Sequence, residues 1–273
     1  MVRYITFKSI HDGVGAQVQD IFSILVFAKH YNLTYIYAPF KKIDHNMGND
    51  SKWVFKWNQF FSLNKLGSAQ TKLSFLRKLL TKKVVLSEQE IENFDINKYP
   101  ENVIFICLNC HAFTEKKASF GDFVPIINEF RKCYGVSKYL KDAPSFSKSE
   151  INVAVHIRRG DALKFPERIL PNSYFVKILD KEIKKLGQKK YKVFIFSEGS
   201  EDDFDEFKKF KNLVFKLDAS PFSSFNYLVK SDILIISKSS FSFVAGILNK
   251  NRVVYAPFWH KPVSPRWTIC DVI

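Results

Sequence analysis

Residues 151–161 read INVAVHIRRGD, so that an apolar run is followed at once by charged side chains. The run predicts a buried strand at Val153–Ile157, because short apolar segments rich in β-branched residues are typical of such strands. Arg158 and Arg159 then lie at its carboxyl end, where they suit a phosphate, since a guanidinium makes paired, charge-assisted hydrogen bonds to phosphate oxygens. The alternative is an exposed basic turn paired with Asp161.

Downstream of this stretch, strands alternate with helices. One amphipathic helix is predicted at Ser173–Leu186, with Asn172 as candidate N-cap and Gly187 as its stop. Further strands are predicted at Lys192–Phe196, Leu213–Leu217, Ile233–Ser237 and Arg252–Ala256. This alternation indicates an α/β fold with a parallel sheet, in which ligands collect beyond the carboxyl ends of the strands.

Upstream, the chain begins with a strand-helix-strand unit. Its two strands are predicted at 3–8 and 33–38, and its helix at 16–31. Later strands are predicted at 84–86 and 103–107. The basic stretch Lys52–Lys83, rich in Trp and Phe, is expected to be helical and partly exposed. Residues 142–150 have no hydrophobic period and include a proline. We therefore predict an N-terminal domain at 1–143 and a C-terminal domain at 144–273.

The charge balance narrows the choice of partners only slightly. The 273 residues carry 42 Lys and Arg against 27 Asp and Glu, a net charge of +15. Such a field attracts a phosphate-bearing substrate, nucleic acid or an acidic membrane face, although a solvated lysine-rich surface explains it equally well. The N-terminus has no signal-peptide pattern, and no apolar run approaches the roughly 20 residues of a membrane span. We expect a cytoplasmic protein, soluble or peripherally bound to a membrane.

The four cysteines are too few and too scattered for a disulfide framework. Cys107, Cys110 and His111 spell the CxxCH pattern of c-type haem attachment, but that chemistry needs export, and the pattern follows a buried strand. No second pair of ligands has the spacing of a zinc site. Buried thiols at a strand end are the better interpretation.

Three further motifs carry residues suited to binding. Residues 237–242, SKSSFS, precede an apolar helix, so Ser239 and Ser240 either cap it or help its N-terminus bind phosphate. Residues 196–199, FSEG, place a serine and a carboxylate at a strand end. Residues 12–17, DGVGAQ, form a glycine-bearing turn, and glycines allow close approach of the backbone to a ligand.

In this order the motifs resemble those of the GDP-fucose-dependent fucosyltransferase superfamily, which includes α1,2-, α1,6- and protein O-fucosyltransferases. Residues 156–161 resemble its His-x-Arg-Arg-x-Asp motif, and residues 239–242 resemble its serine-rich third motif. Residues 196–198 are similar to its next strand end, and residues 13–17 to its Gly-x-Gly-Asn-Gln turn. The similarity is dense from Ile151 to Asn249.

The resemblance implies a GT-B architecture: two Rossmann-like domains with parallel sheets facing a cleft. The C-terminal domain would hold GDP-fucose and the N-terminal one chiefly the glycan acceptor, with no metal or other cofactor. It implies a donor site in which His156 lies near the guanine and Arg158 on the β-phosphate. The full set of donor-binding residues implied is Gly13, Gly15, Gln17, His156, Arg158, Arg159, Ser197, Glu198, Ser239, Ser240 and Phe241.

It also implies an inverting hexosyltransferase reaction, in which the acceptor hydroxyl attacks as GDP departs. Arg158 would stabilise the charge that grows on the leaving phosphate. Asp161 or Glu167 would accept the proton of the hydroxyl, unless Glu167 only forms a surface ion pair with Arg168. Arg159 and Asp161 would hold the loop in shape.

Two positions depart from the family pattern. Ala16 stands where the family usually has Asn, and Ser224 stands where several relatives have an Asp that reads guanine. Another sugar nucleotide is therefore an alternative donor. Two alternatives of other classes also remain at this stage: a basic nucleic-acid-binding protein, suggested by the charge and the 28 Phe, and a non-catalytic glycan-binding module.

Overall fold

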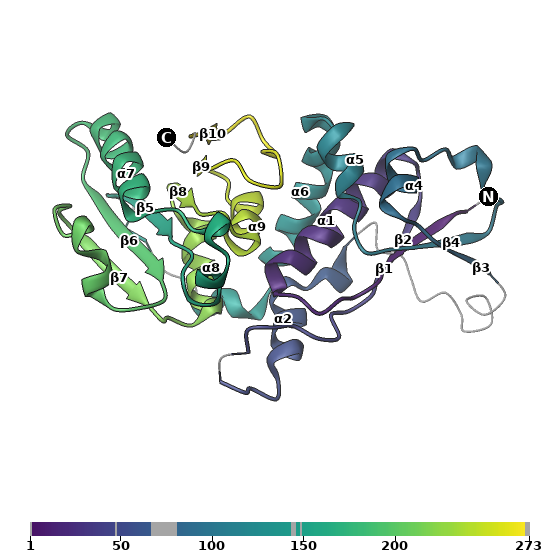
Figure 1. Ribbon diagram of the computed structural model, residues 1–273, viewed down its shortest axis with the longest axis horizontal. Helices are drawn as coiled ribbons and strands as arrows, with labels where there is room; N and C mark the ends of the chain where they lie inside the picture. Colours follow the sequence, from purple (N-terminus) through teal and green to yellow (C-terminus); the bar gives the residue numbers. More distant parts are fainter. Residues whose placement is uncertain (1, 47, 67–80, 143–145, 148, 271–273) are drawn as a thin grey trace. The chain divides into compact units, whose positions relative to one another are not determined.

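The computed structural model describes residues 2–46, 48–66, 81–142, 146–147 and 149–270. The chain divides into two compact units, Met1–Lys138 and Tyr139–Ile273, a few residues before the boundary predicted from the sequence. Both units contain an all-parallel sheet with helices, as the strand-helix alternation predicts (Figure 1). The α/β fold class is therefore confirmed.

Unit 1 is built on a four-stranded sheet of order β2-β1-β4-β3. Its strands are β1 (Tyr4–Phe7), β2 (Thr34–Ile36), β3 (Lys82–Val85) and β4 (Val103–Cys107). Its helices are α1 (Val14–His30), α2 (Trp53–Phe61), α4 (Glu88–Glu92), α5 (His111–Lys116) and α6 (Phe120–Gly135), with short 3₁₀ turns at Leu63–Lys65 and Ile96–Lys98.

Helix α1 is more deeply buried than a single apolar stripe predicts. Every residue from Gln17 to Ala28 is buried, including the polar Asp20. The reason is that α5 and α6 cover the face that the sheet does not. Phe22, for example, packs edge-on against Phe130 of α6, with ring centroids 5.6 Å apart.

Unit 2 is built on a six-stranded sheet of order β10-β9-β8-β5-β6-β7. Its strands are β5 (Ile151–His156), β6 (Tyr191–Ser197), β7 (Leu213–Leu217), β8 (Ile233–Ile236), β9 (Arg252–Tyr255) and β10 (Trp267–Ile269). Its helices are α7 (Asn172–Leu186), α8 (Pro221–Lys230) and α9 (Ser240–Leu248). Its 3₁₀ segments are η3 (Lys138–Asp142), η4 (Gly160–Lys164), η5 (Pro166–Arg168) and η6 (Glu201–Phe207).

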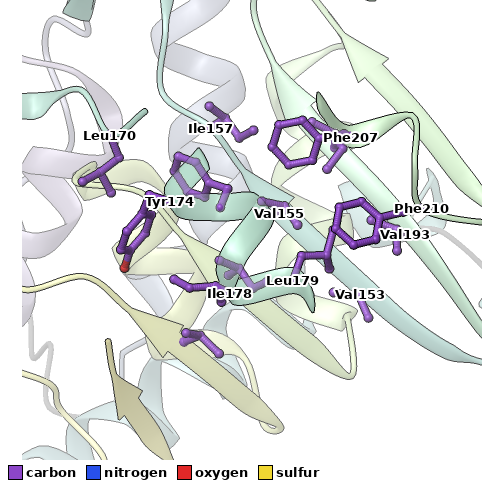
Figure 2. Packing of buried hydrophobic residues seen from close by; sticks show 14 of the residues in the cluster. Val153, Val155, Ile157, Leu170, Tyr174, Ile178, Leu179, Val193, Phe207 and Phe210 are labelled. Carbon is purple, nitrogen blue, oxygen red and sulfur yellow. The ribbon is translucent and has the colours of Figure 1, made fainter. Parts of the chain in front are cut away.

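The two faces of this sheet follow from the alternation of side chains along each strand. Val153 and Val155 of β5 face α7 and η6, and with their neighbours they form a cluster of buried apolar side chains (Figure 2). Ala154 and His156 lie on the opposite face, where His156 packs against the ring of Phe241 in α9. This cluster thus occupies one face, and His156 lies on the other, which α8 and α9 cover with further buried apolar side chains.

Four sequence predictions need correction. Helix α1 begins at Val14, two residues before the predicted start at Ala16, so Gly15 is helical. Pro171, not Asn172, caps α7, while Gly187 ends that helix as predicted. Strand β10 has no predicted counterpart, because a three-residue strand at a sheet edge carries almost no periodicity.

The fourth correction concerns the stretch Lys52–Lys83. In its described part, α2 and a short 3₁₀ turn are helical, while its last residues belong to β3 and not to a helix. Residues 67–80 lie outside the described part, so the prediction for them stays a prediction. Trp57, Phe60 and Phe61 of α2 are fully buried, so the aromatic residues here belong largely to the core. Within the described residues, no helix is both long and apolar enough to cross a membrane.

Gly246 tests the packing of the β9–β10 edge. A Cβ at Gly246 would lie 2.8 Å from Cζ2 of the buried Trp267, whereas one at Gly135, the last residue of α6, would meet nothing within 4 Å. We expect Gly246→Ala to lower the free energy of unfolding by about 1–3 kcal/mol through overpacking, and Gly135→Ala to leave it unchanged or raise it slightly. Thermal and urea unfolding of both variants measure this, and equal effects would contradict the packing.

Candidate functional site

The strand order of unit 2 places a switch point beside β5. Numbered from β5 as strand 1, the sheet reads 3-2-1-4-5-6, the order of the Rossmann fold. The chain moves from β5 to one side through β6 and β7, and then to the other side through β8 and β9. Ligands bind beyond the carboxyl ends of the strands at such a point. The side chains that follow β5 and β8 are therefore the first to consider.

His156 and Ser237 connect these two strand ends. Nδ1 of His156 lies 2.8 Å from the Ser237 hydroxyl, and the imidazole is 9 % exposed. Burial, and secondarily the positive charge of Arg158, lower the pKa of His156 to about 3. The ring is therefore neutral at physiological pH and can act only as a neutral donor or acceptor toward a ligand.

Arg158 lies between two carboxylates. Its guanidinium forms an ion pair with Asp161 and lies 3.9 Å from Oε2 of Glu198, which follows β6. Gly160 makes this arrangement possible, because a Cβ there would lie 2.0 Å from Glu198 Oε2 and its φ is +63°. Arg158 is three-quarters buried, so it is a partly desolvated cation at the strand end.

Arg159 holds the loop after β5. Its guanidinium donates to the carbonyl oxygens of Arg158 and Leu170 and, at 2.6 Å, to Oδ1 of Asn172. Asn172 in turn donates to the carbonyl of Asp203. Burial lowers the pKa of Arg159. These contacts fit the structural role expected of Arg159, while direct contact with a donor stays a prediction.

The N-terminus of α9 lies beyond the neighbouring strand β8. Ser239 occupies the N-cap position, yet its side chain makes no capping hydrogen bond. Capping by this hydroxyl was one of the two interpretations of the motif. The other, phosphate binding, uses the amide groups and positive dipole end of this nine-residue helix. Ser239 is buried and Ser240 partly exposed at this end.

The remaining C-terminal candidates lie nearby in the chain but are more exposed. Glu167 is 65 % exposed and lies 3.8 Å from Nε of Arg168, so the ion pair considered for it is present. Lys238 donates to the Glu167 carbonyl and thereby connects the loop after β5 to the turn after β8. The Ser197 hydroxyl donates to the carbonyl of Glu198. Proton abstraction by Asp161 or Glu167 stays a prediction.

Residues of the N-terminal turn belong to unit 1. Gly13 is the N-cap of α1, and a Cβ there would lie 3.0 Å from the ring of His45. Gln17 is fully buried: its amide donates to the carbonyls of Asp12 and Lys42 and accepts from Ser9. Gly15 is buried inside the helix. Their predicted contact with a donor stays a prediction.

The CxxCH residues have local partners. The Sγ atoms of the buried Cys107 and Cys110 lie 3.9 Å apart, and Nε2 of His111 lies 2.9 Å from Oδ1 of Asp20. Burial raises the pKa of the Cys110 thiol. In the described part of the chain, no group of three or more His, Cys, Asp or Glu side chains is placed to hold a metal ion.

The sequence missed two residues that complete this site. Ser237 and Lys238 lie in the motif at residues 237–242, but their contacts with His156 and Glu167 depend on β8 lying next to β5. No local pattern reports that neighbour relation. A sequence search for polar residues after every strand would have identified both as candidates.

A family model described as glycosyl transferase family 11 matches residues 92–268, more than half of the 273 residues. No curated protein sequence matches the chain.

Solved structures share its fold at low sequence identity. NodZ α-1,6-fucosyltransferase soaked with GDP-fucose superposes with a TM-score of 0.52 at 14 % identity, covering 92 % of this chain and 94 % of that one. POFUT1 in its apo form gives 0.52 at 12 %, covering 92 % and 95 %, and POFUT1 in complex with GDP gives 0.50 at 12 %, covering 99 % and 98 %.

The chain belongs to glycosyl transferase family 11, within the fucosyltransferase superfamily that the motifs resemble. It is a glycosyltransferase with the GT-B fold. Membership in this family favours the enzyme over the nucleic-acid-binding and glycan-binding alternatives.

The low pKa of His156 predicts a pH dependence of stability. Between its ordinary value of 6.5 and about 3, the unfolded chain binds a proton that the native imidazole does not. Stability contributed by His156 is therefore full above pH 6.5 and falls as the pH drops, by about 2 kcal/mol between pH 7 and pH 5. His156→Asn should remove that loss. An unchanged loss in the variant, measured by urea unfolding at both pH values, would contradict the buried neutral imidazole.

Position 160 should not tolerate a residue with a side chain. Gly160→Ala combines a positive φ with a clash against Glu198, whereas Gly187→Ala, at φ +60°, has the strain but nothing within 4 Å. A positive φ strains an L residue at both positions, and Gly187, with ψ −121°, also lies outside the left-handed α region. We expect Gly160→Ala to lower the melting temperature distinctly more than Gly187→Ala does. Equal melting temperatures would show that Glu198 does not lie against Gly160.

Proposed function

We propose that this glycosyltransferase transfers L-fucose from GDP-fucose to a hydroxyl of a glycan acceptor, with inversion at the anomeric carbon. The observation that carries the proposal is the position of Arg158, which follows β5 at the switch point in a chain of glycosyl transferase family 11. NodZ soaked with GDP-fucose and POFUT1 in complex with GDP share the fold, and the ligands of these two structures support a GDP-sugar as donor.

The proposed reaction makes one bond and breaks one. The acceptor oxygen bonds to the anomeric carbon while the bond from that carbon to the β-phosphate oxygen breaks, so GDP leaves with the electron pair. Negative charge grows on the phosphate. Arg158 is partly buried and held by Asp161, so it is oriented before the reaction and stabilises that charge without reorganisation.

The α9 N-terminus would bind the other phosphate oxygens. Its first amide groups and the Ser239 and Ser240 hydroxyls lie beyond the strand that borders β5. Helix N-termini favour anions through their amide donors and dipole. Together with Arg158, these groups supply the charge that a divalent cation would otherwise supply, and we therefore assign no metal to the reaction.

The general base, which takes the proton of the acceptor hydroxyl, is assigned to the loop that carries Arg158. Asp161 is 43 % exposed and within hydrogen-bonding reach of Arg158, whereas Glu167 is 65 % exposed beside Arg168. In the proposal, either carboxylate takes the acceptor proton. Glu198 is the second carboxylate beside Arg158, and we assign it to orienting the guanidinium.

Recognition of the nucleobase is assigned to the face of the sheet that carries His156. His156 is neutral and lies between Ser237 and Phe241, and Phe241 packs edge-on against Phe225 of α8. Ser224, the neighbour of Phe225, is buried in α8 where several relatives have Asp. A hydroxyl reads a base edge with less charge assistance than a carboxylate, so another sugar nucleotide is the alternative outcome of the test below.

We also propose that the protein is cytoplasmic. Its four cysteines are all free thiols, which is typical of a reducing compartment. Peripheral binding to a membrane stays a prediction.

Nucleotide binding is tested by thermal stabilisation with GDP, UDP, ADP and dTDP. We expect GDP to raise the melting temperature, since a ligand at 100 times its Kd adds about 2.7 kcal/mol to the stability of the native state. Arg158→Ala should abolish the shift and lower the transfer rate about 10² to 10³-fold. Arg266→Ala is the matched control, because its guanidinium contacts the carbonyl of Lys250 before the amino end of β9.

A shift with a different nucleotide would retain the transferase and change the sugar donor. No shift with any of the four, or an undiminished shift in Arg158→Ala, would contradict the assignment of the diphosphate to this strand end.

A further inference from the structure

Three exposed side chains of unit 2 form a stacked cluster. The guanidinium carbon of Arg168 lies 4.8 Å from the ring centroid of Phe165 and 4.6 Å from that of Trp259. Phe165 is 44 % and Trp259 51 % exposed. We call these three residues the Arg168 stack. None of them has a role in the reaction as proposed above.

The Arg168 stack lies at the carboxyl edge of the sheet. Phe165 and Arg168 belong to the loop that follows β5, and Trp259 follows β9 after its last residue, Tyr255. Lys238, which follows β8 directly before Ser239, donates to the carbonyl of Glu167, next to Arg168. The stack is therefore continuous with the loop and the turn to which we assign the diphosphate.

Exposure of the two aromatic rings of the stack to water is energetically unfavourable. The two large aromatic rings, 44 % and 51 % exposed, form an apolar surface at this edge. Such surfaces mark interaction sites more often than scattered apolar residues do. Elsewhere in unit 2, aromatic side chains such as Phe204 and Phe207 are fully buried, in contrast to the two rings of the stack.

Arg168 adds a polar component with fixed geometry. Its Nε is buried and has no hydrogen-bond partner among the described residues, with Glu167 Oε1 at 3.8 Å. Its guanidinium carbon lies 4.8 and 4.6 Å from the centroids of the two rings. A planar guanidinium held in this way presents its N–H donors in a rigid pattern, beside flat apolar rings that lose little conformational entropy on contact.

This pairing fits one class of ligand at this edge. A pyranose ring has an apolar C–H face, which packs on an aromatic ring, and a rim of hydroxyl oxygens, which accept hydrogen bonds from a guanidinium. We propose that the Arg168 stack binds a pyranose ring of the acceptor glycan. The inference rests on the proposed function, because it takes the second substrate to be a glycan. It assigns part of acceptor binding to unit 2, whereas the family resemblance implies chiefly the N-terminal domain.

The test uses the full chain with GDP-fucose and a panel of methyl β-galactoside, β-glucoside, β-N-acetylglucosaminide and α-mannoside. Release of GDP is measured against saccharide concentration for the wild type and Trp259→Ala. We expect at least one saccharide to accelerate release, and Trp259→Ala to raise the KM for it about 10-fold, equivalent to about 1.4 kcal/mol. The KM for GDP-fucose should change less than about twofold, because a stacking loss of this size is confined to one site.

Two further variants separate stacking from general loss of apolar surface. Trp259→Phe retains an aromatic face and should recover most of the saccharide response. Leu163→Ala removes an exposed apolar side chain from the same loop without touching the stack, and should behave as wild type. Melting temperatures of all variants should stay close to that of the wild type, since Trp259 and Leu163 are both more than half exposed.

Tryptophan fluorescence distinguishes failure of this inference from failure of the proposed donor. Saccharide binding to Trp259 should change the emission of the wild type but not of Trp259→Ala, and this titration needs no nucleotide. Absence of GDP binding with an intact fluorescence response would overturn the donor and retain the stack. The inference itself is overturned if no saccharide of the panel changes either signal, if Trp259→Ala responds as wild type, or if Trp259→Ala instead loses GDP binding.

Discussion

The hydrogen-bonded pairing of β5 with β8 is the constraint on which the candidate site depends. It makes β5 the strand from which the chain moves first to one side of the sheet and later to the other. Because of it, residues separated by about eighty positions, His156 and Ser237, meet at one strand end. The side-chain alternation of β5 then directs Val153 and Val155 into the core and His156 to the opposite face. The residue assigned to binding and the valines that pack against α7 thus lie on different faces of the same strand.

The two adjacent arginines have different environments, and this difference explains why only one of them is assigned to chemistry. Arg159 donates to two carbonyls and to Asn172, and these contacts fix the course of the loop. Among the described residues, the Arg158 guanidinium pairs with carboxylates, which a phosphate can displace or join because ion pairs at a partly exposed site contribute little energy. The neutral His156 adds no positive charge, so the electrostatic contribution at this strand end comes from Arg158 and the helix terminus.

Much of this fold could be predicted because the long elements carry strong periodicity. The strands β4, β5, β6 and β7 and the helix α7 follow directly from their apolar patterns. What could not be predicted depends on tertiary neighbours: the all-round burial of α1 by α5 and α6, the three-residue β10, and the aromatic residues of α2 that lie in the core. In the site, the strand-end arginines, the serines and Glu198 were identifiable by their position after strands. The contacts of Ser237, Lys238 and Trp259 were not, since each depends on which strands are neighbours.

The central claim is that the β5 strand end of unit 2 binds the diphosphate of a sugar nucleotide. A crystal structure of the full chain grown with GDP tests it most directly. The account predicts the β-phosphate within hydrogen-bonding distance of the Arg158 guanidinium and the other phosphate oxygens at the first amides of α9. Phosphates bound elsewhere, with Arg158 still paired only to Asp161 and Glu198, would contradict it.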